Sequence, residues 1–144
     1  MDLTQDFPRS PYEKLNGMVH LPRMADKARA KGAGLLGEYI YPCPLDQMLL
    51  AFIGMEPEVF FEAAQRRDDQ ELAEWVQKKA VHHTSEEIEA WNRAFLNRGP
   101  SGEEQEKRFL NSRARLAPDR TDITAWVDLM ELDEGRTVPI RVQS

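Results

Sequence analysis

The sequence predicts an all-α fold of six to eight short helices, with room for one minor strand pair near residues 37–42. Apolar side chains recur at i, i+3, i+4 and i+7 in several segments, as in residues 45–52. Prolines and capping residues stand where such segments begin, and glycines stand where they end. The 144 residues fit one domain, which we expect to span residues 1–144 as a single helical domain.

The first helix is expected to begin at Pro11, because Ser10 and Glu13 have the spacing of a capping box around it. A second helix is predicted over residues 22–31, opened by a proline and stopped by Gly32. Its small residues form a stripe that favours close approach of a neighbouring backbone.

The segment after this helix is not expected to be helical. Residues 38–41 are aromatic and bounded by Gly37 and Pro42, which is typical of extended chain or a small strand. Pro44 then opens a helix with a regular apolar face, and Gly54 ends it.

The remaining chain is predicted to hold five more helices. They begin at Pro57, Asp69, Thr84, Glu103, and at Thr121 or Asp122. Thr84 and Glu87 form a capping box, and residues 103–116 carry so few apolar side chains that we expect a peripheral helix. The proline near the C-terminus, in TVPIRV, excludes a central strand there.

Composition narrows the functional classes. A net charge of −6 argues against a general nucleic-acid binder, because phosphate recognition needs clustered lysine and arginine. The longest apolar run, residues 48–55, is too short to cross a membrane, and MDLTQDFPRS lacks the features of a signal peptide. A single cysteine excludes an internal disulfide. We therefore expect a cytoplasmic protein without nucleic-acid or membrane partners.

Charge is uneven along the chain. Residues 1–35 carry six basic and four acidic side chains, a net of +2, whereas the rest carry thirteen basic and twenty-one acidic, a net of −8. A basic N-terminal third on an acidic body favours an anionic ligand. Internal pairing between the two regions is the simpler interpretation, because most exposed charges are solvated or weakly paired.

The helix PRMADKARA is the strongest candidate for a site. Arg23 and Arg29 each lie three residues from Asp26, so one carboxylate can orient both guanidiniums. Together with Arg9 and Tyr39 they predict an anion pocket. The competing interpretation is a buried structural network.

That network would tie this helix, including Lys27, to Glu38, Asp46 or helix C-terminal carbonyls.

Cys43 precedes the proline that opens a helix, so we expect it at the N-cap, where aligned N–H groups stabilise a thiolate. A nucleophile also needs a base, and the sequence does not place His20 beside it. Lone cysteines are usually buried as small hydrophobes, which makes a structural Cys43 the favoured interpretation. The histidines and Cys43 lack metal-ligand spacing, and His82 and His83 are expected in a solvated loop. No metal or cofactor is predicted.

Three motifs resemble a known family. DFPRSP at 6–11, LPRMADKARA at 21–30 and GEYIYPCPLD at 37–46 are similar to the bacterial family of domain of unknown function 5069. The resemblance is strongest over residues 6–54 and weaker after Gly99. It implies a small bacterial domain and supplies no catalytic residue. The matching positions are Pro8, Arg9, Ser10, Pro11, Pro22, Arg23, Asp26, Lys27, Arg29, Gly37, Tyr39, Cys43, Pro44 and Asp46.

These observations favour a binding or accessory protein that recognises an anionic small molecule or a protein partner through its N-terminal third. The alternative is a small enzyme that uses Cys43 or the cluster of Arg23, Asp26, Arg29 and Tyr39. The signature loops of nucleotide-binding proteins and common hydrolases are missing, which favours the first class. The candidate binding residues are Arg9, Arg23, Asp26, Lys27, Arg29, Tyr39, Cys43 and Asp46.

Overall fold

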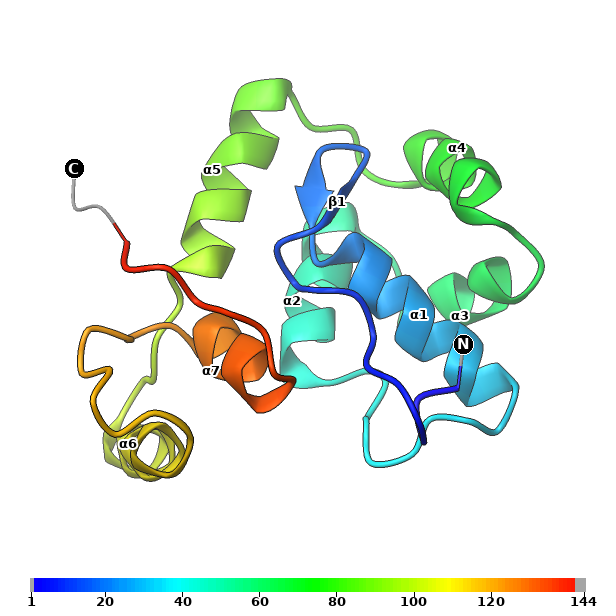
Figure 1. Cartoon of the computed structure of the whole chain (residues 1–144). Helices are drawn as coiled ribbons and strands as arrows, with labels where there is room; N and C mark the ends of the chain where they lie inside the picture. The colour runs from blue at the N-terminus through cyan, green and yellow to red at the C-terminus, as the bar shows by residue number, and fades with distance from the viewer. Residues whose placement is uncertain (1, 142–144) are drawn as a thin grey trace. The chain divides into compact units, whose positions relative to one another are not determined.

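A computed structural model describes residues 2–141 (Figure 1). Within this range the chain forms seven helices and one two-stranded antiparallel sheet, and more than half of the described residues are helical. The mostly α-helical prediction is therefore confirmed. The elements are β1 (Lys14–Leu15), β2 (Met18–Val19), α1 (Leu21–Gly32), α2 (Pro44–Ile53), α3 (Pro57–Gln65), α4 (Asp69–Lys79), α5 (Ser85–Leu96), α6 (Glu103–Leu116) and α7 (Trp126–Asp133).

The chain divides into two compact units, Met1–Glu89 and Ala90–Ser144. The division falls inside helix α5, so one continuous helix contributes to both units. Every predicted binding residue lies in the first unit.

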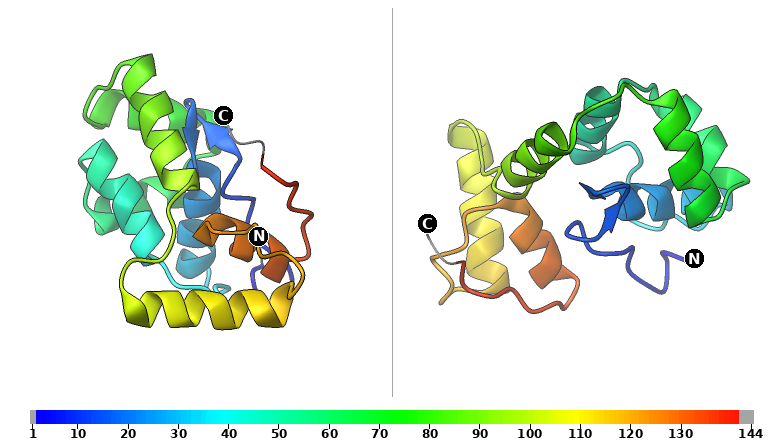
Figure 2. Two further views of the ribbon diagram at one scale, coloured as in Figure 1. Left: turned by 90° about the vertical axis from the view of Figure 1, so that its left-hand side faces the viewer. Right: turned by 90° about the horizontal axis from the view of Figure 1, so that it is seen from above.

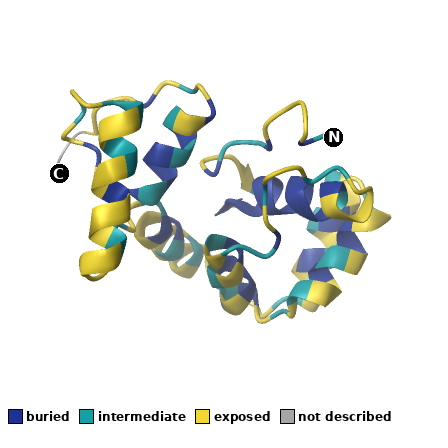
Figure 3. Ribbon diagram, turned by 90° about the horizontal axis from the view of Figure 1, so that it is seen from below, coloured by how far each residue is buried: buried dark blue, intermediate teal, exposed yellow. Residues whose placement is uncertain are grey.

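Helix α1 is the centre of the first unit. Nine of its twelve residues are buried, which makes it dark over most of its length in Figure 3. Its small residues allow close packing on α3, because a Cβ atom at Gly32 would lie only 2.0 Å from Oε1 of Gln65. The Gln65 side chain also donates a hydrogen bond to the backbone oxygen of Ala28, at 2.7 Å. The predicted stripe of small residues thus serves the α1–α3 contact.

The helix predicted to begin at Pro11 is absent from the structure, and that prediction was wrong. The expected capping residues stabilise a turn instead: the Ser10 N–H donates to the Glu13 carboxylate, at 3.2 Å, and the Glu13 N–H donates to the Ser10 carbonyl. Asn16 and Gly17 then adopt positive φ angles of 55° and 75°, which reverse the chain into a hairpin.

In this hairpin Lys14 pairs with Val19 and Leu15 pairs with Met18. Figure 2 shows the hairpin beside the start of α1.

The strand pair expected near residues 37–42 therefore lies earlier in the chain. Residues 37–42 form turns and irregular backbone. Gly37 has a φ of 63°, and a Cβ atom there would lie 2.8 Å from the carbonyl oxygen of Leu3, so the position needs glycine. Tyr41 is buried and donates its hydroxyl to the Pro57 carbonyl at 2.7 Å, while Lys31 donates to the Tyr41 carbonyl. These side-chain hydrogen bonds hold the segment, which forms no strand pairing of the kind expected.

Most helix boundaries follow the predicted signals. Cys43 is the N-cap of α2, and Gly54 ends that helix with a φ of 68°. The Thr84–Glu87 capping box opens α5, with hydrogen bonds of 2.8 and 3.1 Å. Helix α4 differs in its cap, because Asp68 accepts the helix N–H where we expected Asp69 to do so. This leaves the Asp69 side chain available for other partners.

The second unit packs α6 against α7, which lie side by side in Figure 2. Its core consists of Phe109, Ile123, Leu129 and Val138. Phe109 is the one buried residue of α6, which confirms a peripheral helix. Helix α7 begins at Trp126, several residues later than predicted, because the Asp122 carboxylate binds Arg120 at 2.9 Å instead of capping the helix.

Candidate functional site

A group of four side chains, which we call the Asp46 cluster, joins α1 to the start of α2; three of them are buried and Cys43 is partly exposed. It consists of His20, Lys27, Cys43 and Asp46. The carboxylate of Asp46 lies 2.7 Å from Nε2 of His20 and 2.7 Å from Nζ of Lys27. It also accepts the Cys43 backbone N–H at 2.9 Å, and the Cys43 sulfur lies 3.2 Å from the Lys27 ammonium.

Local structure brings these groups together. His20 precedes α1 and has a φ of 71°, and Lys27 follows it by two helical turns on the same face. Cys43 and Asp46 occupy the N-cap and N3 positions of α2, where each accepts a backbone N–H of the other. The Asp46 carboxylate therefore serves as a helix cap and as the partner of two basic side chains.

The charges within this cluster are fixed by burial and pairing. Burial alone would raise the pKa of Asp46, but the hydrogen bond from His20 and the charge of Lys27 outweigh it and hold that pKa well below its usual range. Burial lowers the pKa of His20, so the imidazole is neutral and its Nε2–H donates to the ionised carboxylate. Burial and the Asp46 charge raise the pKa of the Cys43 thiol, against the opposing effect of Lys27.

The Asp46 cluster is therefore poorly suited to nucleophilic chemistry. A thiol with a raised pKa is mostly protonated near neutral pH and is a weak nucleophile. His20 and Asp46 are fully buried and Lys27 is 3% exposed, so a substrate has no direct approach to these side chains.

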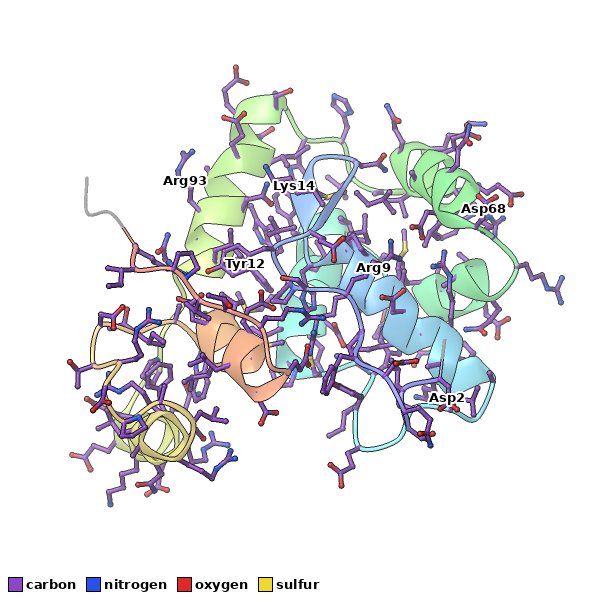
Figure 4. The ribbon with its side chains drawn as sticks, viewed as in Figure 1. Asp2, Arg9, Tyr12, Lys14, Asp68 and Arg93 are labelled. Carbon is purple, nitrogen blue, oxygen red and sulfur yellow. The ribbon has the colours of Figure 1, made fainter. Side chains whose placement is uncertain are left out.

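A second group of charges, the arginine network, contains Arg9, Asp26, Arg29 and Asp69. Figure 4 shows Arg9 on the N-terminal segment that runs beside α1. Its Nε and Nη2 atoms lie 3.1 and 3.0 Å from the two carboxylate oxygens of Asp26, a bidentate pair. Its Nη1 atom lies 2.6 Å from Asp69, and its backbone N–H donates to Asp26 at 2.9 Å.

Arg29 is the second guanidinium that pairs with Asp69. Its Nη1 atom donates to Asp69 at 2.9 Å, and its remaining N–H groups donate to the carbonyls of Ala64 and Arg67. Hydrogen bonds from Arg9, and secondarily from Arg29, lower the pKa of Asp69 to about 2. Two carboxylates thus balance the charges of two guanidiniums, and of the four side chains only that of Asp26 is buried.

Arg23 and Tyr39 lie close to this network. The Arg23 side chain is 3% exposed and donates to the Arg9 carbonyl at 3.2 Å. Its guanidinium lies 5.7 Å from the centre of the Tyr39 ring, within range of a cation–π interaction. The eight predicted residues thus fall into the Asp46 cluster, the arginine network and this cation–π pair.

Two members of these groups were missed from the sequence. His20 lies 26 residues from Asp46, and Asp69 lies 40 residues from Arg29, so neither pairing has a local spacing that could reveal it. The one available signal for Asp69 was its position beside a second aspartate, which already supplies the helix cap.

The first unit also contains a pocket, which we call the histidine pocket, with a volume of about 280 Å³. Buried Met18, Ile53 and Val76 form part of its apolar lining. Its full lining is Asn16, Met18, Ile53, Val76, Gln77, Ala80, Val81, His82, His83 and Ile88. Sequence reasoning did not identify this pocket, because its walls come from β2, α2, α4, α5 and the connecting segments.

The two adjacent histidines behave differently in this pocket. His82 is exposed, as expected for a loop, whereas His83 stacks on Phe52 with ring centres 3.9 Å apart and planes tilted by 7°. The Nε2 atom of His83 lies 2.7 Å from the Phe52 carbonyl oxygen. His83 is therefore held rigidly at the pocket wall.

The described residues form a small, mostly helical protein with two groups of paired polar side chains and a modest pocket in the first unit. None of the described helices is long and apolar enough to cross a membrane. The chain belongs to the family described as domain of unknown function (DUF5069), which it matches over residues 5–136. The match extends beyond Gly99, where the sequence motifs resembled the family less. A search of curated proteins finds no match.

Proposed function

We propose that this protein binds a small molecule, and that the ligand occupies the histidine pocket. The observation that carries the proposal is the combination of buried apolar residues with several polar side chains around a volume of about 280 Å³. Ligand sites in proteins are typically concave and apolar, with a few placed polar groups, and span about 300–1,000 Å³. The pocket is at the lower end of that range, which favours a small ligand.

The sequence suggested an anionic small molecule or a protein partner at the N-terminal third, near Arg23 and Arg29. Pairing of Arg29 with Asp69, and of Arg9 with Asp26, weakens the attraction of these guanidiniums for an external anion. The N-terminal third still contributes to the proposed site, because Asn16 and Met18 line the pocket. Binding at the pocket is therefore our preferred form of the proposal.

The enzyme alternative has less support. The raised pKa of the Cys43 thiol and the burial of His20 and Asp46 argue against nucleophilic catalysis at the Asp46 cluster.

The proposal is tested by titrating the ¹⁵N-labelled full-length protein with indole, a small planar probe, and following amide chemical shifts. We expect the largest shifts at pocket residues. An Ala80→Phe variant, which fills the pocket, should lose these shifts, whereas Ala51→Phe on the exposed face of α2 should keep them. Shifts scattered over the surface, or unchanged in the Ala80→Phe variant, would contradict the proposal.

A further inference from the structure

The lining of the histidine pocket carries no Asp, Glu, Lys or Arg, although such residues make up 31% of the chain. A charged ligand group entering this pocket would lose hydration without meeting an opposite charge among the lining side chains. The pocket is therefore better suited to an uncharged ligand.

Three polar side chains at the pocket have unused hydrogen-bonding capacity. Among residues 2–141, the side chains of Gln77 and His82 make no hydrogen bond. The Nδ2 atom of Asn16 donates to the Ala73 carbonyl at 2.7 Å, which fixes the orientation of the amide and leaves its Oδ1 atom as an acceptor. The pocket thus offers both donors and acceptors to a ligand.

The imidazole of His83 supplies a flat wall. A carbonyl oxygen can only accept, so the contact with Phe52 places a proton on Nε2 of His83. The Nδ1 atom of His83 lies 3.9 Å from the Glu87 carboxylate, whose negative charge disfavours an anionic ligand nearby. A flat ring fixed in the lining in this way favours a planar ligand.

From these features we infer that the histidine pocket binds a small, uncharged aromatic carboxamide, whose amide edge pairs with Gln77 and His82. This inference rests on the proposed function and specifies the ligand class for the same site. A carboxamide carries one acceptor and two donor hydrogens in a plane, which matches a primary amide such as that of Gln77. Its aromatic ring would contact the apolar lining formed by Met18, Ile53 and Val76.

The test compares three probes of nearly equal size and shape at neutral pH: benzamide, which is neutral, benzoate, which is anionic, and benzamidine, which is cationic. Affinities are measured from amide shifts of the full-length protein. We expect benzamide to bind with a Kd on the order of millimolar, as its few atoms allow. It should bind about fivefold more tightly than either charged probe, because both lose hydration, benzoate meets no cation in the lining, and the Glu87 carboxylate near His83 is exposed, so solvent screens its attraction for benzamidine. Equal or tighter binding of benzoate or benzamidine would overturn the inference.

A matched pair of variants locates the contact. Gln77→Leu should weaken benzamide binding by about fivefold, the effect of losing an amide hydrogen bond, while indole still binds. Gln70→Leu makes the same change at another exposed position of α4 and should leave both probes unaffected. Benzamide affinity that is unchanged in Gln77→Leu would also overturn the inference.

The two proposals fail in different ways. If indole binds at the pocket but the three benzene derivatives show no preference for the amide, only the ligand class is wrong. If neither indole nor benzamide binds there, the proposed function itself is wrong.

Discussion

The Nζ atom of Lys27 lies 2.7 Å from a carboxylate oxygen of Asp46, and both side chains are almost fully withdrawn from solvent. A buried ion pair of this kind contributes little net stability compared with apolar packing, because both charges lose hydration. Removing one partner is costly, however, since the other charge is then left buried without compensation. The first prediction follows from this asymmetry.

Asp46→Asn should destabilise the protein by about 3 kcal/mol or more, because the Lys27 ammonium then lacks a carboxylate. The measurement is the free energy of unfolding from urea denaturation. Asp122→Asn is the matched control, since Asp122 pairs with Arg120 at an exposed position, and it should change stability little. Similar small losses in both variants would show that the Asp46 cluster is not a stabilising unit.

Stability should also fall as the pH is lowered from 7 to 5. Burial lowers the pKa of His20 below its ordinary value of 6.5 in the folded state, so the unfolded chain binds a proton more readily in this range. The stability that neutral His20 contributes is fully present above pH 6.5. It is lost as the pH falls towards the lowered pKa of folded His20. The lowered pKa of Asp46 also makes stability fall as the pH falls. That loss begins only near the ordinary aspartate pKa of 3.8.

The midpoint of urea denaturation, measured at several pH values, checks this prediction. His20→Asn cannot titrate, so the decline between pH 7 and 5 should be smaller in this variant than in the wild type. The comparison uses the change with pH and not the absolute stability, because the substitution alters packing as well. An identical decline in both proteins would exclude His20 as its source.

The thiol of Cys43 should react slowly with a thiol reagent in the native protein at neutral pH, and quickly after unfolding. Burial and the Asp46 charge raise its pKa, which reduces the fraction of thiolate. The rate of modification is followed across pH with and without denaturant. Rapid native reaction with an apparent pKa below the ordinary thiol range would instead favour the enzyme alternative.

Asp26→Ala should cost roughly 2 kcal/mol of stability, because it removes both carboxylate oxygens that hold Arg9. Urea denaturation measures this loss. The arginine network should also give the wild type no thermal stabilisation by inorganic phosphate, since its charges are paired internally. A phosphate-dependent rise in Tm that Arg23→Ala abolishes would support the anion site suggested by the sequence.

Much of the fold could be predicted because most helix ends are encoded locally. Pro44, Gly54 and the Thr84–Glu87 pair act within one helical turn, so a short stretch of sequence contains all the partners they need. The predictions at Pro11 and Asp122 were wrong although the contacts there are also local. Ser10 and Glu13 pair with each other in a turn that leads into the hairpin, and Asp122 binds Arg120 in place of a helix N–H.

The candidate site could be predicted only in part. Lys27, Cys43 and Asp46 were selected because their motifs lie close in sequence, and the structure does bring them into contact. His20 and Asp69 were missed because tertiary packing alone joins them to their partners. The histidine pocket depends on four elements and the segments that connect them, and it has no sequence motif of its own.

Arg9 bridges Asp26, 17 residues away, and Asp69, 60 residues away, so the arginine network closes a long loop of chain without a covalent link. The N-terminal segment and α4 are therefore expected to open together when the protein fluctuates. Their backbone amides should share one rate of hydrogen exchange, and Arg9→Ala should release both from protection at once. Because α4 also forms a wall of the histidine pocket, the first ten residues would set how often that wall moves.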